Sequence, residues 1–294
     1  MNSLKLFVTG STGFLGGYLN NFLKEYHVNH LVRNLEINIS EFAVIHLAGK
    51  AHDLKSTSAP DEYYQVNTEL TKKVFDAFIN SDAKVFITLS SVKAVADEVP
   101  GELTEEYNPN PITHYGKSKL LAEQYILSKE IPEGKRVYIL RPCMIHGPGN
   151  KGNLNLLYKL VSKGIPWPLG AFNNKRSFCS IDNLMFVFKE IMEREDIPSG
   201  VYNVADDVPP STNEVISILA TSQNRKPRIW HISKGLIQAA AKIGNVLKLP
   251  LNEERLQKLT DSYVVSNKKL ISAIGKPLPV SSREGLLKTF QSFQ

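Results

Sequence analysis

Two side chains four residues apart form a candidate pair for acid–base chemistry. Tyr115 and Lys119 lie in the segment HYGKSK, residues 114–119. On a helix this spacing places both side chains on one face, where a neighbouring ammonium favours tyrosinate and lowers the pKa of the phenol. A phenol tuned in this way can act as a general acid or base near neutral pH. Ser91, at the end of a predicted strand, could hydrogen-bond the same substrate oxygen.

The Tyr-x-x-x-Lys spacing is not specific by itself, since a chain with 11 tyrosines should contain about one such pair by chance. A second copy occurs at Tyr125 and Lys129. Ten residues further along one helix, Tyr125 would point about 80° away from Tyr115 and lie about 15 Å from it along the axis. Both cannot serve one site. Tyr115 follows the turn-rich segment 108–111 and is predicted at the helix start, whereas Tyr125 is predicted to pack.

A glycine-rich segment follows the first predicted strand and opens the first predicted helix. It reads GSTGFLG from Gly10 to Gly16. Gly10 would permit the tight turn, Gly13 would let the backbone approach a pyrophosphate, and Gly16 would let the helix pack on the strand. The helix N-terminus would supply free N–H groups for the phosphates. We therefore predict a dinucleotide-binding turn, with a tight turn that binds no ligand as the alternative.

The residues after the second predicted strand bear on the choice of cofactor. An acidic side chain there would bind a ribose 2′-OH, whereas an arginine accommodates a 2′-phosphate. The strand ends in Leu31–Asn34, and no acidic residue follows until Glu36. Arg33 favours NADP(H) over NAD, and a solvated loop charge is the alternative interpretation.

These residues need a scaffold that brings strand ends and helix starts together. Short apolar runs alternate with helical periods through the first half of the chain. Predicted strands cover 4–8, 28–32, 44–47, 84–89, 136–140 and 201–204, and predicted helices cover 14–23, 66–78 and 115–128. Continuous apolar strands that alternate with helices indicate a parallel sheet buried on both faces. We predict a Rossmann-type, doubly wound α/β fold.

Glycine and proline cluster after about Gly147, and helical patterns dominate from Pro209 onward. We therefore predict a dinucleotide-binding domain over 1–168, rejoined by about 181–205, and a smaller, mostly C-terminal substrate-binding domain over 169–294. Together the two would enclose a cleft at the carboxyl edge of the sheet, where ligands of open α/β sheets bind.

Composition narrows the class of protein. The 294 residues are 42% hydrophobic and 22% charged, which excludes a disordered chain. The net charge of +6 suits an anionic small molecule as well as nucleic acid or a membrane surface. Cys143 and Cys179 form no Cys-x-x-Cys motif, so no disulfide framework or zinc ribbon is expected. We predict a cytoplasmic protein without a metal site or a nucleic-acid partner.

Membrane segments are not predicted. The first residues lack a basic and apolar leader, and no apolar run approaches the roughly 20 residues that a span requires. The segment Gly235–Leu251 is apolar enough to suggest peripheral membrane contact. Lys242 and Lys248 interrupt it, and a helix packed on its own domain is the favoured interpretation.

Seven segments carry a resemblance to a known family. They are TGSTGFLG (9–16), VIHLAG (44–49), VN (66–67), LSSVKAV (89–95), HYGKSK (114–119), RPCMIHGPG (141–149) and RSFCSIDN (176–183). In this order they resemble the extended short-chain dehydrogenase/reductases of the NAD(P)-dependent nucleotide-sugar epimerase/dehydratase group. RSFCSIDN and the late segment RLQKLTDSYVVSNKK (255–269) are similar to the UDP-sugar 4-epimerase and UDP-4-keto-6-deoxy-hexosamine 4-reductase branch.

The resemblance implies a role for each matching residue. Tyr115 would be the catalytic acid/base, Ser91 would hold the substrate oxygen, and Lys119 would lower the pKa of Tyr115 and bind the nicotinamide ribose. The other implied cofactor contacts are Thr9, Gly10, Gly13, Phe14, Leu15, Gly16, Arg33, Asn34, Asn38, Ile39, Leu47, Ala48, Gly49, Ser90, Pro142 and Ile145. The implied substrate contacts are Ser91, Lys93, Asn153 and Arg176. A bidentate guanidinium at Arg176 suits a sugar-nucleotide diphosphate.

Several positions depart from the family pattern. Val92 and Lys93 stand where dehydratases carry an acidic pair, so we discount 4,6-dehydration. The segment 33–43 is too short for the usual third strand and helix, which leaves Asn38 and Ile39 at the expected adenine side. His146 stands in place of a family tyrosine, and we interpret it as packing or lining the cleft rather than as a base or metal ligand. Beside it, Cys143 is interpreted as a small apolar filler.

The resemblance implies hydride transfer at C4 of a UDP-hexose, with NAD or NADP as cofactor, in surface-polysaccharide sugar biosynthesis. A 4-epimerase would keep NAD⁺ bound and return the hydride to the other face of the sugar, whereas a 4-ketoreductase would consume free NADPH. The alternatives are a non-catalytic dinucleotide-binding sensor or scaffold and an enzyme acting on a lipid- or steroid-like substrate. The resemblance also implies a homodimer paired through the helices at 66–79 and 115–128.

Overall fold

The computed structural model describes residues 5–22, 26–30, 37–50, 59–150, 152–247 and 252–293. Its centre is a parallel sheet with the strand order β2-β1-β3-β4-β6-β9. The strands are β1 (Lys5–Thr9), β2 (His27–His30), β3 (Ala43–His46), β4 (Val85–Leu89), β6 (Arg136–Pro142) and β9 (Gly200–Val204). The predicted strands therefore form, shifted by one or two residues at their ends, and the part of 28–32 beyond His30 lies outside the described residues.

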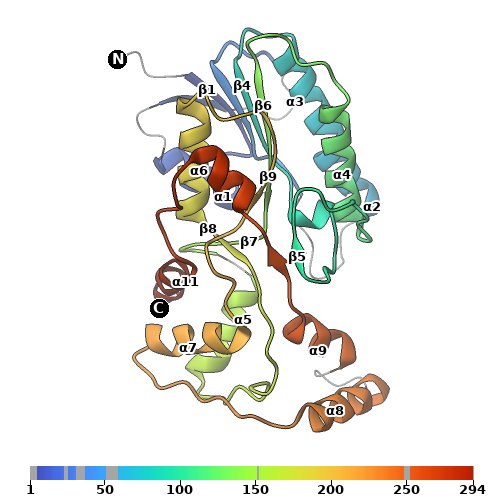
Figure 1. The fold of residues 1–294 in the computed structure, drawn as a ribbon, viewed down its shortest axis with the longest axis vertical. Coiled ribbons are helices and arrows are strands. Elements are labelled where there is room, and N and C mark those ends of the chain that lie inside the picture. Colours follow the sequence, from blue (N-terminus) through green and yellow to red (C-terminus); the bar gives the residue numbers. More distant parts are fainter. Residues whose placement is uncertain are drawn as a thin grey trace.

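Helices cover both faces of this sheet (Figure 1). Helices α1 (Phe14–Phe22) and α6 (Ile181–Glu193) lie on one face, and α3 (Leu70–Ile79) and α4 (His114–Leu127) lie on the other. Successive strand residues alternate between the two cores, because side chains on a strand point to opposite faces. On β1, Leu6 and Val8 pack in the cluster that contains Leu19 of α1, whereas Phe7 packs with Phe75 of α3. The predicted doubly wound parallel sheet is confirmed.

The strand order agrees with the shortness of segment 33–43, because β2 and β3 both pair with β1, on opposite sides. After β2 the chain returns to pair β3 with β1 on the other side, with Thr9 opposite His46. Among the described residues, β2 and β9 are the edge strands of this sheet, and no strand lies beyond β2. All these strands end at the same edge, since they are parallel.

A long helical segment precedes β4. It starts as α2 (Pro60–Tyr63), passes through a π-helical turn η1 (Tyr64–Glu69) and continues as α3. Such π-helical turns interrupt α-helices frequently at functional sites. Here the turn contains Asn67, a residue of the VN segment.

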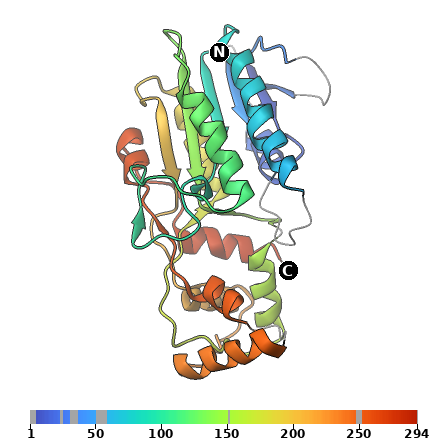
Figure 2. The ribbon, with the colours of Figure 1, turned by 90° about the vertical axis from the view of Figure 1, so that its right-hand side faces the viewer.

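A second hydrophobic cluster lies beyond the carboxyl edge of the sheet (Figures 1 and 2). It draws on α5 (Asn153–Ser162), α7 (Thr212–Ser222), α8 (Lys234–Leu247), α9 (Glu253–Thr260) and α11 (Ser282–Gln291). Leu154 and Val161 of α5 pack here although they precede residue 169. The boundary between the two domains stays a prediction.

Short elements that the sequence did not predict join the two halves. They are η2 (Val92–Ala94), the parallel pair β7 (Met144–His146) and β8 (Phe178–Ser180), the parallel pair β5 (Glu102–Leu103) and β10 (Val264–Val265), and α10 (Lys268–Ile274). Strands of two or three residues leave no recognisable period in a sequence. None of the helices in the described ranges is long and apolar enough to cross a bilayer.

Candidate active site

The glycine turn forms between β1 and α1 as the sequence predicts. Gly10 has a φ of +74°, and a Cβ there would lie 2.6 Å from the backbone nitrogen of Ala48. A Cβ at Gly16 would lie 2.4 Å from the Cα of Ser11. A side chain at Gly16 would clash with the turn itself. This corrects the expectation that Gly16 is required for packing of the helix on the strand.

The turn leaves room for a ligand at the start of α1. Among the described residues, a Cβ at Gly13 would meet only the backbone oxygen of Gly10, at 3.3 Å. The first N–H groups of a helix carry partial positive charge and lack intrahelical partners. This combination of a tight turn and an open helix start fits the pyrophosphate of a dinucleotide.

A buried chain of hydrogen bonds fixes the strand ends on either side of the turn. Oγ1 of Thr9 lies 2.7 Å from Nδ1 of His46, and Nε2 of His46 lies 2.9 Å from Oγ1 of Thr71. The Ala48 N–H donates to Thr9, and Thr71 donates to the Asn67 carbonyl. These donors require the His46 tautomer with its proton on Nε2. Burial lowers the pKa of His46 to about 3, and the charge of Lys119 adds to this effect.

Asn67 connects this region to the catalytic helix. Its Oδ1 accepts a hydrogen bond from the Lys50 N–H at 2.8 Å, and its Nδ2 donates to the Lys50 carbonyl and to Oγ of Ser118. The fully buried Asn67 thereby joins the loop after β3 to α4. Asn67 in the VN segment and His46 in VIHLAG are functional residues whose spacing in the sequence predicts no role for either.

Tyr115 and Ser91 meet at the carboxyl end of β4. Thr113 caps α4 by accepting from the Gly116 N–H, which places Tyr115 in the first turn of the helix. Burial raises the pKa of Tyr115 above 10.0, and a hydrogen bond with Ser91 acts in the opposite direction. The pKa of Tyr115 is thus not lowered overall, because burial outweighs the hydrogen bond with Ser91, and the effect of Lys119 on it stays a prediction. The ring of Tyr63 packs edge-on, with 6.3 Å between centroids.

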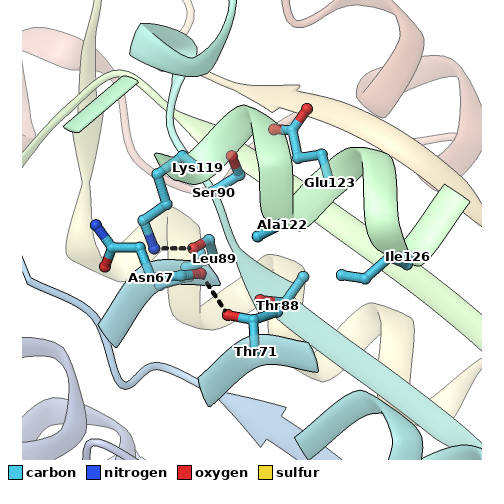
Figure 3. Close-up of a pocket in the computed structure, with 9 residues that line it drawn as sticks. All are labelled: Asn67, Thr71, Thr88, Leu89, Ser90, Lys119, Ala122, Glu123 and Ile126. Atoms are coloured by element: carbon cyan, nitrogen blue, oxygen red, sulfur yellow. Dashed lines mark hydrogen bonds between the residues drawn. The ribbon is translucent and has the colours of Figure 1, made fainter. Parts of the chain in front are cut away.

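Lys119 lies on the same side of α4 as Tyr115. Its Nζ donates to the backbone oxygen of Leu89 at 2.8 Å, beside Asn67 (Figure 3). A Cβ at Gly49 would lie 3.0 Å from this Nζ, so Gly49 is where the loop after β3 meets the lysine. Burial lowers the pKa of Lys119 to about 8, against the opposing charge of Glu123.

Glu123 forms a buried ion pair with Arg141. Arg141 on β6 donates from Nε to Oε1 at 3.0 Å and from Nη2 to Oε2 at 2.5 Å, and both side chains are buried. A small cavity between Lys119, Glu123 and Ser90 has room for about one water molecule. Among the described residues, Oγ of Ser90 is buried without a hydrogen-bond partner.

The second Tyr-x-x-x-Lys pair lies elsewhere, as the sequence predicts. The Tyr125 hydroxyl contacts both carboxylate oxygens of Asp76 on α3, at 2.7 and 2.8 Å. The ammonium groups of Lys72 and Lys129 lie over its ring. Tyr125 therefore joins two helices.

Two of the predicted substrate contacts come together across the halves of the molecule. Burial lowers the pKa of Lys93, the carboxylate of Asp97 opposes this effect, and the charge of Arg176 adds to the lowering. Lys93 lies over the ring of Tyr263, 4.5 Å from the centroid, and the backbone of Tyr263 pairs with that of Arg176. Nε of Arg176 donates to the Asp261 carbonyl at 3.3 Å. Two cations thus lie close together beyond the end of β4.

The remaining predicted contacts vary in position. Leu47 and Ala48 follow β3, and Pro142 ends β6. Ile39 is buried in the core cluster on the α3 side, and its predicted cofactor contact stays a prediction. Arg33, Asn34 and the side chain of Asn153 lie outside the described residues. Asn38, Phe14, Leu15 and Ile145 are at least partly accessible.

His146 has a structural role. It is fully buried, with Nδ1 2.9 Å from Oγ1 of Thr289 and Nε2 3.3 Å from Oδ2 of Asp206. Its ring packs edge-on against Phe178. Burial raises the pKa of the nearby Cys143 thiol well above 9.0. These contacts agree with packing roles for both residues.

The fold and the site define a dinucleotide-binding α/β protein with a Ser, Tyr and Lys set at the sheet edge. A family model described as the NAD dependent epimerase/dehydratase family matches residues 6–205. The UDP-glucose 4-epimerase of Vibrio cholerae is 31% identical and the alignment covers 98% of this chain and 95% of that protein. The N-acetyl-alpha-D-glucosaminyl-diphospho-ditrans,octacis-undecaprenol 4-epimerase of Escherichia coli O157:H7 is 27% identical, with 84% and 76% covered.

Solved structures share the fold over nearly the whole chain. MoeE5 in complex with UDP-glucuronic acid and NAD superposes with a TM-score of 0.74 at 20% identity, covering 98% of each chain. RMD from Pseudomonas aeruginosa complexed with NADPH superposes with a TM-score of 0.72 at 22% identity, covering 99% of this chain and 98% of that one. The chain belongs to the NAD dependent epimerase/dehydratase family, and the resemblance drawn from its motifs is confirmed.

Proposed function

We propose that this protein is a 4-epimerase of a UDP-linked hexose that uses a nicotinamide dinucleotide. The observation that carries the proposal is the hydrogen bond between Tyr115 and Ser91 on the same side of α4 as Lys119, at the sheet edge next to the glycine turn. Of the two relatives described above, the one that aligns over more of the chain is a UDP-glucose 4-epimerase.

The chain's own residues divide the work as follows. Gly10, Gly13 and the start of α1 would bind the cofactor pyrophosphate, and Lys119 would hold its ribose near Gly49. When bound, the cofactor accepts a hydride from C4 and returns it. Tyr115, as the tyrosinate, would take the proton from the C4 hydroxyl when the hydride leaves C4 and return it when the hydride comes back, while Ser91 would hold the same oxygen.

Arg176 and Lys93 would bind the diphosphate of the substrate. Two adjacent cations match the charge of a nucleoside diphosphate, and a guanidinium can bind its oxygens in pairs. Burial lowers the pKa of both side chains, so an arriving anion would compensate for the solvation that they lack. The side chains come from opposite halves of the molecule, which would position the sugar between them.

A 4-ketoreductase is the second candidate, because Arg33 favours NADP(H) in the sequence. The way in which the cofactor is used distinguishes the epimerase from the reductase. A nucleotide that absorbs at 260 nm and stays bound through desalting supports the epimerase. NADPH consumption with a 4-keto sugar supports the reductase.

The decisive experiment is a substrate screen with product NMR at C4. Purified protein would be incubated with UDP-, dTDP- and GDP-hexoses and with an undecaprenyl-diphospho-N-acetylhexosamine, as used by the relative from E. coli. We expect inversion at C4 of a UDP-hexose. If only the lipid-linked sugar is inverted, that sugar and not a UDP-hexose is the substrate. If no compound reacts at C4, the proposal is refuted.

A further inference from the structure

Helix α8 lies at the end of the molecule farthest from the sheet (Figures 1 and 2). One of its faces packs on its own half of the protein through Ile237 and Ala241. The adjoining face is apolar and uncovered. Leu236 is 66% exposed, Ile243 is 56% exposed and Leu247 is 62% exposed.

These exposed residues form a single stripe. Leu236, Ala240, Ile243 and Leu247 are spaced by four, three and four residues, which places them on one side of a helix. The polar residues Lys234, Gln238, Lys242 and Asn245 fall on another side. The helix therefore has an apolar surface wider than the part that its own domain covers.

The segment that leads into α8 and the loop paired with it also expose large apolar side chains. Trp230, just before α8, is 58% exposed, and its backbone pairs with that of Trp167. Ile165, two residues before Trp167, is also exposed. Soluble monomeric proteins rarely leave large apolar side chains gathered in this way unless something binds them.

Positive charge is concentrated in the part of the chain that contains the stripe. Residues 215–252 contain six lysines and arginines and no acidic residue, so this segment accounts for the whole net charge of +6. Lys226, Arg228, Lys234 and Lys242 are all exposed. Arg225, Lys226 and Arg228 also line a hollow of about 310 Å³ with the apolar residues Val161, Ile165 and Ile216.

We propose that α8, Trp230 and the loop 225–228 bind the surface of an anionic phospholipid bilayer. Helix α8 would lie in the plane of the interface, with its stripe in the acyl boundary and its lysines at the headgroup phosphates. Amphipathic helices with Trp and Leu on one side and Lys or Arg on the other bind membranes in this manner. Each basic residue near an anionic surface adds to the attraction.

The charge argues against the other occupants. A second copy docked through this face would bring two copies of the basic segment 225–242 together, which opposes association. Nucleic acid would use the cations but leave the apolar stripe exposed. The proposal does not depend on the reaction, although it would place the chain at the surface that holds lipid-linked sugars.

The first test is co-sedimentation with vesicles. We expect the protein to bind vesicles of equal parts phosphatidylcholine and phosphatidylglycerol, and to bind pure phosphatidylcholine vesicles much more weakly. The variant Leu236→Ser/Ile243→Ser should weaken binding at least about tenfold, which corresponds to about 1.4 kcal/mol. The control variant Leu127→Ser/Val208→Ser changes two residues that are 59% and 63% exposed on other elements, and it should bind like the wild type.

A fluorescence test follows the predicted contact at Trp230. The chain has two tryptophans, and Trp167 is buried while Trp230 is exposed. Anionic vesicles should shift the emission to shorter wavelength, and Trp230→Phe should abolish this shift. The variant Lys226→Glu/Arg228→Glu should remove the preference for phosphatidylglycerol.

Three outcomes would overturn the inference. They are absence of binding to anionic vesicles, equal binding by the α8 variant, and a wild-type dimer that Leu236→Ser/Ile243→Ser converts to monomer. Epimerisation of a water-soluble UDP-sugar without vesicles should be the same in all these variants. A failed vesicle test therefore leaves the proposed reaction standing, and a failed reaction leaves the membrane surface standing.

Discussion

Lys119 Nζ lies 2.8 Å from the backbone oxygen of Leu89, the last residue of β4. This bond ties the helix that carries Tyr115 to the strand end that leads into Ser91. Lys119 and Tyr115 are one helical turn apart, so the bond holds the first turns of α4 against the end of β4, where Tyr115 hydrogen-bonds Ser91. The lysine therefore positions the site through a neutral backbone acceptor, while Glu123 contributes from one turn further along.

The ionisation of Lys119 can be measured directly. Burial lowers its pKa from 10.5 to about 8, and Glu123 opposes this lowering. We expect its side-chain amine to titrate near pH 8 by NMR of labelled lysine, with Lys119→Met assigning the signal. Glu123→Gln should move the midpoint to lower pH, since a nearby carboxylate favours the charged amine. A Lys119 midpoint at the ordinary 10.5 would contradict the burial argument.

The two Tyr-x-x-x-Lys pairs offer a matched comparison. Tyr115→Phe should lower kcat by about 10²- to 10⁴-fold, as loss of a general acid/base does, while bound cofactor remains. Tyr125→Phe removes a hydrogen bond to Asp76 and should lower the free energy of unfolding by about 1–3 kcal/mol with kcat unchanged. Turnover that survives in Tyr115→Phe would exclude the catalytic assignment.

The sheet was predictable because its signals are local. Apolar runs mark the strands, and the glycine turn marks the first crossover, so these predictions hold within a residue or two. The short pairs β5 with β10 and β7 with β8 were missed, since two or three residues show no period. Their pairing partners come from distant parts of the chain.

The candidate site was predictable in its residue types and less so in its energetics. Ser91, Tyr115 and Lys119 lie in quoted motifs, and the structure brings them to one sheet edge. The pKa of Tyr115 was expected to fall and is instead raised, because the sequence does not reveal how deeply the phenol is buried. The roles of His46 and Asn67 depend on partners 17 to 51 residues away, which no spacing rule identifies.

Two adjacent glycines on α1 offer a test of the glycine turn as the binding site of the cofactor pyrophosphate. A Cβ at Gly16 would lie 2.5 Å from the Gly10 backbone oxygen, whereas a Cβ at Gly17 meets no described atom within 4 Å. Gly16→Ala should displace the turn, weaken dinucleotide binding at least about tenfold and lower the free energy of unfolding by about 1–3 kcal/mol. Gly17→Ala should bind normally and gain about 0.5–1 kcal/mol of stability, because alanine favours a helix. Calorimetry would measure the affinity of each variant for NAD and NADP. Equal binding by the two variants would rule out the glycine turn as the pyrophosphate site.

His46 should make the fold sensitive to acid. Its pKa is about 3 in the folded protein and about 6.5 in an exposed histidine, so below pH 6.5 the unfolded chain binds a proton that the folded protein excludes. The free energy of unfolding should therefore fall as the pH drops from 6.5 toward 5, with a slope that approaches about 1.4 kcal/mol per pH unit from this group. His46→Asn should be less stable at pH 7, since it breaks the bonds to Thr9 and Thr71, and its stability should change less over this range. His231→Asn, at an exposed histidine, should keep the wild-type slope. Urea unfolding at several pH values would compare the three proteins, and an unchanged slope in His46→Asn would assign the acid sensitivity to other groups.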